Sequence, residues 1–237
     1  DWAPYTDGYW VHTDAGWTWV SYEEYGSVTY HYGRWARVDG LGWIWKPDYE
    51  WAPAWVSWRY SDDYIGWAPL PPEVVFDSGV GISVWVDRDY GIGPGYYNFC
   101  DVRSFGSPVM RNVIYPRSRN TVIIEKTVNV TNITYRSDRR WVYNGGPDYH
   151  RVSSRSHRKI ESLKLDRRTG DGIGGWRHTM RPAKRSGDRL VVEAPRVRRD
   201  NRDVRPPKVA RKYDRVQADR GWREVSTRFL VPAGAVT

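Results

Sequence analysis

An aromatic repeat in the first third of the chain is the feature that most restricts how the chain can fold. GWTW at residues 16–19 returns 26 residues later as GWIW at 42–45, and GYW at 8–10 corresponds to GRW at 33–35. Within this third of the chain the pair GW comes once more, at 66–67. A period of about 20 to 50 residues is typical of stacked units that share a core which no unit could bury alone.

The alternation of residue types within the repeat predicts β-strands. Trp17 and Trp19 lie on one side of an extended chain and Thr18 lies on the other. Frequent glycines and prolines divide the segment into short strands joined by tight turns. We therefore predict an all-β fold, built as a short-stranded antiparallel meander or small barrel. Between residues 8 and 72 we expect at least four strands and no helix longer than one turn.

Changes in composition divide the chain into three regions. Prolines at 69, 71 and 72 cannot continue a β-ladder, so a Trp/Tyr-rich repeat module should occupy residues 1–72. Residues 73–166 form a second β-rich region. Residues 167–237 are rich in Arg, Asp, Gly and Pro and hold isolated apolar residues, which predicts a long, basic, extended C-terminal arm.

The second region contains two stretches that favour strands. Residues 81–87 alternate apolar and polar side chains, and residues 121–135 are almost all β-branched or polar, which predicts one long strand. The turn residues before Pro147 are followed by a pattern that predicts a short helix containing Val152. Residues 160–165 fit either a strand or a final turn.

The hydrophobic residues are unusual in kind. The chain holds 15 Trp and 17 Tyr against four Phe and two Met. Indole and phenol rings bury a large area but carry an N–H or O–H that needs a hydrogen-bond partner. We expect a shallow core in which many rings are partly exposed.

Two arrangements of these rings are open. In the first, exposed rings on a rigid sheet stack on sugars. The candidate platform residues are Trp55, Trp58, Tyr60, Trp35 and Tyr32. In the second, the sister repeat and the arm pack against both faces of the sheet. The rings that we expect to be more buried than Trp55 are Trp17, Trp43, Trp51 and Tyr25. On this view Trp43→Ala should cost about 3 to 5 kcal/mol of stability.

Charge is distributed unevenly along the chain. Residues 1–100 hold five Lys/Arg and 14 Asp/Glu, whereas residues 101–237 hold 32 and 14. The acidic first part and the basic second part should attract each other, within one chain or between chains. Arg alternates with Asp over residues 198–203, so we do not expect nucleic acid as a partner.

The basic arm is too long to be ordered by a few valines on its own body. At ~3.3 Å per residue its 71 residues could span about 230 Å. We expect it to run mostly without helix and to reach a neighbouring chain. The residues that we expect to hold it in apolar grooves are Trp176, Val191, Val209 and Trp222.

No pattern in the sequence indicates catalysis, a metal or a cofactor. The acidic pairs at 23–24 and 62–63 fall in turns, where carboxylates are usually solvated. The five histidines lack metal-ligand spacing, and we expect His31 to be exposed on a strand. GIGPGYYNF at 91–99 is not followed by a helix that could hold a phosphate. Cys100 is the one cysteine, which excludes an internal disulfide.

Several motifs carry a family resemblance. They are GWIW at 42–45, PDYEWAPAWV at 47–56, GWAPLPP at 66–72, TVNVTNIT at 127–134 and YNGGP at 143–147. Over about residues 8–165 they resemble an uncharacterised Trp-rich family of exported bacterial proteins, a domain of unknown function. The resemblance implies a secreted or envelope-associated protein without an established activity.

These observations lead to two expected functions. The first is a non-enzymatic structural or scaffolding subunit of an extracytoplasmic bacterial assembly, held to neighbouring subunits by its C-terminal arm. The second is a glycan-binding cell-envelope protein, with polysaccharide as the partner. No run approaches the ~18 apolar residues of a membrane helix. The chain begins at Asp1, and we expect a signal peptide to have been removed.

Overall fold

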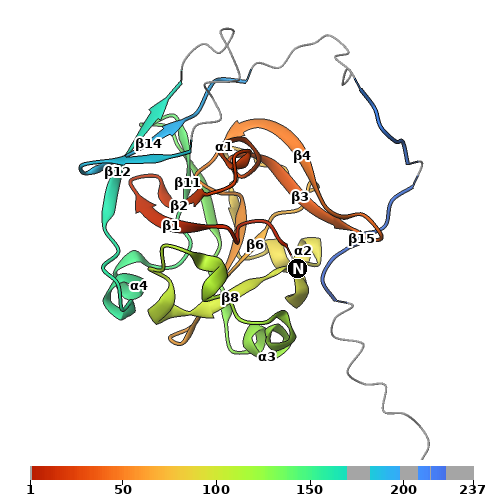
Figure 1. The fold of residues 1–237 in the computed structure, drawn as a ribbon, viewed down its shortest axis with the longest axis horizontal. Coiled ribbons are helices and arrows are strands. Elements are labelled where there is room, and N and C mark those ends of the chain that lie inside the picture. The colour runs from red at the N-terminus through yellow and green to blue at the C-terminus, as the bar shows by residue number, and fades with distance from the viewer. Residues whose placement is uncertain (1, 170–181, 198–207, 214, 223–237) are drawn as a thin grey trace, which may run out of the picture.

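The computed structural model describes residues 2–169, 182–197, 208–213 and 215–222 (Figure 1). Strands dominate and the helices are short, so the all-β prediction is confirmed. Residues 8 to 72 hold six strands in three antiparallel pairs. The one helix among them is a single turn of four residues, as expected.

The described part of the chain holds short helices and strands of two to ten residues. The strands are β1 (Gly8–Thr13), β2 (Gly16–Ser21), β3 (Tyr32–Val38), β4 (Gly42–Trp51), β5 (Val56–Tyr60), β6 (Tyr64–Pro69), β7 (Ile82–Ser83), β8 (Asn98–Asp101), β9 (Val128–Asn129), β10 (Asn132–Arg136), β11 (Trp141–Asn144), β12 (Ser162–Arg168), β13 (Lys184–Ser186), β14 (Arg189–Glu193) and β15 (Ala218–Asp219). The helices are α1 (Gly26–Thr29), α2 (Val86–Tyr90), α3 (Asn120–Glu125) and α4 (Tyr149–Arg155), with the 3-10 turns η1 (Pro94–Tyr96), η2 (Val102–Ser104), η3 (Met110–Asn112) and η4 (Arg117–Arg119).

The described strands form three sheets. The largest has eight strands in the order β13-β14-β12-β1-β2-β11-β10-β7, and the others have the orders β15-β3-β4 and β8-β6-β5-β9. The largest sheet contains strands from all three regions of different composition. β12, at the end of the second region, pairs in parallel with β1 of the first region and with β14 of the third. The segment around β14 is therefore part of the body rather than a free arm.

The aromatic repeat builds one hairpin in each sheet. Each hairpin places two tryptophans directly opposite each other across its two strands. The pairs are Trp10 with Trp19, Trp35 with Trp45, and Trp58 with Trp67. Cross-strand aromatic pairs stabilise hairpins, and here they also turn one face of each hairpin toward a shared core.

Phe105 lies in the middle of that shared core. Its ring centroid is 5.1 Å from that of Trp17, 5.9 Å from that of Trp67 and 6.2 Å from that of Trp58. These rings meet edge to face, which is a favoured geometry for aromatic pairs. The first and third hairpins are thus joined through a residue of the second region.

The stretch 121–135 differs from the predicted long strand. Residues 120–125 form α3, in which Ile123 is buried while Val122 is exposed. Asn120 fixes the start of this helix by donating from its side-chain amide to the carbonyls of Pro94 and Tyr97. Tertiary contacts therefore override the β-propensity of the run. The remainder of the stretch forms the two short strands β9 and β10.

The stretch 81–87 is also a strand over only part of its predicted length. β7 ends at Ser83, and α2 follows and stops at Gly91, whose φ of 63° is left-handed. Asp87 accounts for the change, because its carboxylate accepts hydrogen bonds from Ser57 Oγ at 2.6 Å and from Tyr97 Oη at 2.7 Å and pairs with Arg59 at 2.9 Å. The predicted short helix near Pro147 is confirmed as α4, with Val152 buried.

His31 is buried, so its predicted exposure is wrong. Its Nδ1 donates to the carbonyl of Ala52 at 2.8 Å, and its ring stacks on Trp51 with centroids 5.3 Å apart. Burial lowers its pKa from 6.5 to about 4.

The position of each tryptophan predicts what its loss will cost. Trp67 is fully buried, so Trp67→Ala should lower the free energy of unfolding by about 3 to 5 kcal/mol. Trp43 is only partly buried, where it packs on Tyr96, so Trp43→Ala should cost about 1 to 2 kcal/mol rather than the larger value expected from sequence. Denaturant unfolding of both variants checks the order, and equal costs would contradict it.

The buried imidazole predicts acid sensitivity. Because the pKa of His31 is lower in the folded protein than in the unfolded chain, its contribution to stability is complete above about pH 6.5. That contribution falls by up to roughly 3 kcal/mol as the pH drops toward 4. His31→Gln should unfold with a shallower pH dependence than the wild type in urea titrations at pH 7, 6, 5 and 4. The same change at the exposed His157 is the control, and identical slopes for wild type and His31→Gln would refute the assignment.

Candidate functional site

The five rings predicted as a sugar-binding platform are all buried. They are Trp55, Trp58, Tyr60, Trp35 and Tyr32. β5 and the residue before it lie between two core clusters: Val56 and Trp58 belong to the shared core, and Trp55, just before the strand, belongs to a second cluster with Phe76 and Tyr97. Both faces of this strand are therefore packed, and these five rings do not present an exposed platform.

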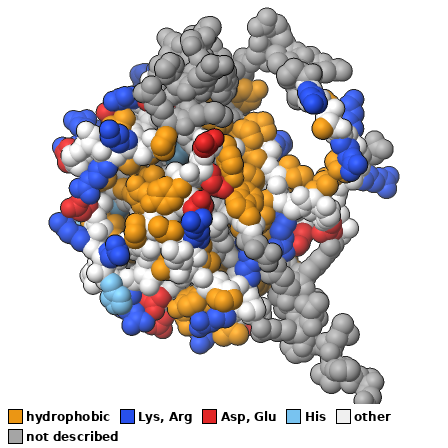
Figure 2. All heavy atoms as spheres, viewed as in Figure 1, with side chains coloured by type: hydrophobic (Ala, Val, Ile, Leu, Met, Phe, Trp, Pro, Cys, Tyr) orange, Lys and Arg blue, Asp and Glu red, His pale blue; other side chains and the backbone are white. Residues whose placement is uncertain are grey.

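The expected order of burial is also wrong in most respects. Trp55 is 1% exposed, so Trp43, Trp51 and Tyr25 are less buried than Trp55, and Tyr25 is 40% exposed. Trp17 is fully buried, in keeping with the prediction. The exposed rings in the described part of the chain are Trp2, Tyr22, Tyr25, Tyr49, Tyr135, Tyr213 and Trp222. Figure 2 shows one face of the molecule, with hydrophobic side chains gathered in the middle and Lys and Arg mostly around the rim.

The acidic pairs take part in structural contacts. Glu23 accepts hydrogen bonds from the indole of Trp2 at 2.7 Å and from the hydroxyls of Tyr25 and Tyr30. Asp62 pairs with Arg155 at 3.0 Å. Among the described residues no cluster of three or more His, Cys, Asp or Glu could hold a metal ion, and no helix is long and apolar enough to cross a membrane.

The four predicted arm residues differ in their surroundings. Trp176 lies outside the described residues. Val191 is part-buried within β14, but its neighbours Leu190 and Val192 fill the core, because the strand alternates. Val209 is 52% exposed, so it does not lie in an apolar groove as predicted. Trp222 is 54% exposed, yet its indole N–H donates to the carbonyl of Gly91 at 2.8 Å.

Residues 217–222 form the clearest interaction site of the described chain, and we call them the C-terminal segment. They add β15 as an edge strand to β3, with Ala218 opposite Val38 and Asp219 opposite Arg37 (Figure 1). The backbone N–H of Asp39 donates to the carbonyl of Gln217 at 3.0 Å. An extended peptide is thus held to a sheet edge by backbone hydrogen bonds, the geometry of strand addition.

A glycine-rich loop completes the receptor for this segment. The backbone N–H of Gly93 donates to the carbonyl of Arg220 at 2.8 Å, and that of Gly95 donates to the carbonyl of Gly221 at 2.9 Å. A Cβ on Gly221 would lie 2.7 Å from the backbone nitrogen of Tyr96, and one on Gly93 would lie 2.9 Å from the carbonyl oxygen of Arg220. Glycine on both sides therefore permits the close approach of the two backbones.

Two ion pairs flank the backbone contacts. Asp219 pairs with Arg37 at 2.6 Å, and both side chains are largely buried. Arg220 pairs with Glu73 at 3.0 Å, in a more exposed position. The segment contributes an acid to one pair and a base to the other, and this fixes the register. A shift by one residue would place either Arg220 beside Arg37 or Asp219 beside Glu73, two like charges in each case.

The glycines at 91–95 stand out in the sequence, where the only site they suggest is a phosphate loop. The sequence feature that relates to this contact is a pair of glycine-containing stretches, one at residues 91–95 and one beside Trp222. Glycine in both stretches allows two backbones to approach each other closely. Neither stretch shows from sequence that the other is its partner.

The comparisons with known proteins add a family for the repeat. A model described as "Family of unknown function (DUF6600)" matches residues 1–74, which include all three hairpins. This agrees with the resemblance to an uncharacterised domain of unknown function, although the motifs that carry the resemblance extend to residue 147. No curated protein and no solved structure matches the chain.

The close backbone approach predicts the effect of one methyl group. Gly221→Ala should unseat the C-terminal segment, because its φ of 81° disfavours a side chain and its Cβ would meet backbone atoms. Amide hydrogen exchange at Gly93 and Gly95 should then accelerate by at least about tenfold.

Gly187→Ala is the matched control. Gly187 also has a positive φ, of 60°, but no atom lies within 4 Å of a Cβ placed there. Its variant should leave the exchange rates of Gly93 and Gly95 unchanged. If Gly221→Ala behaves like Gly187→Ala, the segment is not held as described.

Proposed function

We propose that the protein is a non-enzymatic structural subunit that joins neighbouring copies by exchanging its C-terminal segment. The observation that carries the proposal is the strand addition of residues 217–222 to β3 and the glycine loop. This contact combines a β-ladder, four further hydrogen bonds and two ion pairs in six residues.

The chain that leads to this segment supports exchange. Residues 208–213 are exposed throughout, and in Figure 1 they run apart from the body. The contacts that seat the C-terminal segment therefore do not depend on which body the segment comes from. When the same contacts can form within a chain or between chains, exchange between copies is a low-cost route to assembly.

Charge favours association in the same way. The first 100 residues are acidic and the remaining 137 are strongly basic, so the C-terminal half of one copy is attracted to the body of another. The attraction between exposed charges should weaken as the salt concentration rises. We place the protein outside the cytoplasm, as the resemblance of its aromatic motifs to exported bacterial proteins suggests, with other protein subunits as its partners.

A complementation experiment tests the exchange. Gly221→Ala removes the segment's ability to dock but leaves the receptor intact, and Gly93→Ala blocks the receptor but leaves the segment intact. Each variant alone should be monomeric by native mass spectrometry. An equimolar mixture should form a 1:1 pair, because the intact segment of one variant can occupy the intact receptor of the other.

The wild-type protein and a chain ending at residue 216 complete the design. The wild type should assemble further as its concentration rises, whereas the truncated chain should remain monomeric. The proposal would be overturned if the mixture and the wild type both stay monomeric while residues 208–222 of the wild type resist proteolysis. This result would show that the segment docks on its own body.

A further inference from the structure

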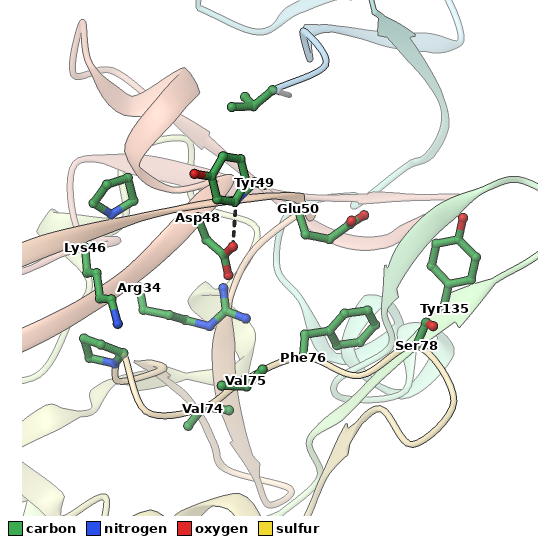
Figure 3. Close-up of a pocket in the computed structure, with 13 residues that line it drawn as sticks. Arg34, Lys46, Asp48, Tyr49, Glu50, Val74, Val75, Phe76, Ser78 and Tyr135 are labelled. Carbon is green, nitrogen blue, oxygen red and sulfur yellow. Dashed lines mark hydrogen bonds between the residues drawn. The ribbon is translucent and has the colours of Figure 1, made fainter. Parts of the chain in front are cut away.

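The second hairpin borders a pocket of about 830 Å³ (Figure 3). The pocket lies along β4, whereas the C-terminal segment pairs with the other edge of the hairpin, β3. One wall is the edge strand β4, which contributes Lys46, Asp48 and Glu50. The opposite wall is the chain around Val74 and Phe76. The pocket thus joins a charged wall to an apolar one.

Arg34 lines this pocket and is 3% exposed. Its guanidinium lies over the ring of Trp55, with 3.6 Å between Cζ and the ring centroid. Its Nη1 donates to the carbonyl of Gly33 at 3.0 Å. Burial lowers the pKa of Arg34 to about 10, so the side chain still carries its charge at neutral pH.

The other two nitrogens of Arg34 have no acceptor in the described part of the chain. They are Nε and Nη2, and both are buried. A buried donor without a partner costs about 1 to 3 kcal/mol, and more when it is charged. Asp48 points toward the guanidinium in Figure 3, but its carboxylate accepts from the backbone N–H of Tyr49 at 2.7 Å and not from these two nitrogens.

The identity of the two free nitrogens indicates the chemistry that fits them. Nε–H and the adjacent Nη2–H lie nearly parallel on one edge of a guanidinium, which is the geometry that binds both oxygens of one carboxylate. Nη1, which is already used, lies on the opposite side. The stacking on Trp55 fixes the plane of the fork, so little ordering is needed when an anion arrives.

We propose that this pocket binds a small monocarboxylate with an apolar body. Its two oxygens accept from Nε and Nη2 of Arg34, and its apolar part lies against Val74 and Phe76. Asp48 and Glu50 on the same strand repel a dianion, which favours a carboxylate over a phosphate. Asp48 is part-exposed and moves aside to admit the ligand.

The test follows the Nε–H signal of Arg34 in ¹H–¹⁵N NMR spectra of the full chain during titration with hexanoate. The expected result is a saturable downfield shift of this signal. Acetate, which lacks the apolar part, should bind at least about tenfold more weakly because it loses four buried methylene groups. Inorganic phosphate should leave the signal in place. N-acetyl-leucine, which mimics a peptide C terminus, is titrated in the same way. If it binds more tightly than hexanoate, the carboxylate comes from a peptide C terminus, and if hexanoate binds more tightly, it comes from a free organic acid.

Variants separate the effect of the two parallel N–H donors of Arg34 from the effect of its positive charge. Arg34→Lys keeps the charge but not the two parallel donors, and should lower hexanoate affinity at least about tenfold by calorimetry. Arg119→Lys is the matched control, because Arg119 also stacks on a ring, that of Tyr115 at 4.2 Å, but lies outside the pocket. Asp48→Ala should bind hexanoate at least as tightly as the wild type.

Three results would overturn the proposal. The first is an Arg34 Nε–H signal that hexanoate does not move in the wild type or in Asp48→Ala. The second is phosphate binding as tight as hexanoate binding, and the third is equal hexanoate affinity in Arg34→Lys and Arg119→Lys. The wild-type titration needs no variant, so the proposal stays testable if Arg34→Lys does not fold. The outcome is independent of the C-terminal segment.

Discussion

The hydrogen bonds that buried indoles make to acceptors elsewhere in the chain organise much of the fold. Tryptophan supplies most of the aromatic area of the shared core, and an unpaired buried donor would offset much of what each ring contributes. Of the nine buried tryptophans in the described part of the chain, five donate to an acceptor outside their hairpin partner strand, whereas the indole N–H groups of Trp10, Trp19, Trp51 and Trp141 have no hydrogen-bond partner. Trp17 donates to Pro147, Trp58 to Asn144, Trp67 to Tyr5, Trp55 to His31 and Trp35 to Thr29.

Four of these bonds tie a loop, a helix or the N-terminal stretch to the core, and the bond from Trp58 to Asn144 joins β5 to the end of β11. Asn144 shows the effect most clearly, because its side chain accepts from Trp58 and donates to the carbonyl of Ala54, while its backbone N–H donates to Ala15. One residue of the second region thereby holds parts of the first hairpin and of the segment that enters the third. Residues 1–74 match a family model, yet their core is completed by residues such as Phe105 and Asn144 that lie beyond the match.

The parts of the structure that sequence predicts are those governed by local pattern. Alternation and turn residues indicated the hairpins, and the paired tryptophans lie where the repeat places them. Burial was predicted poorly, because alternation tells which residues share a face but not whether a second layer covers the other face, as it does over Trp55. The run that contains Ile123 became a helix because Asn120 bonds to carbonyls about 25 residues earlier, a contact that local propensity does not contain. The receptor for the C-terminal segment was missed for the same reason, since it joins glycines more than 120 residues apart.

In each hairpin, the residue just before the first tryptophan of the cross-strand pair is not fixed by the packing of the aromatic repeat, so it can serve a function. Because side chains alternate along a strand, that residue lies on the strand face opposite its tryptophan, and it is Tyr9, Arg34 and Ser57 in the three hairpins. Ser57 is enclosed in a hydrogen-bonded network with Asp87, and Tyr9 packs against the ring of Tyr22 and the margin of the shared core. Arg34 is the member with donors left over, and its hairpin has one edge taken by the C-terminal segment and the other facing the pocket. A repeat that fixes the inward face leaves the outward residue free to differ between copies, and in the second hairpin that residue is an arginine with two buried donors that no described residue accepts from.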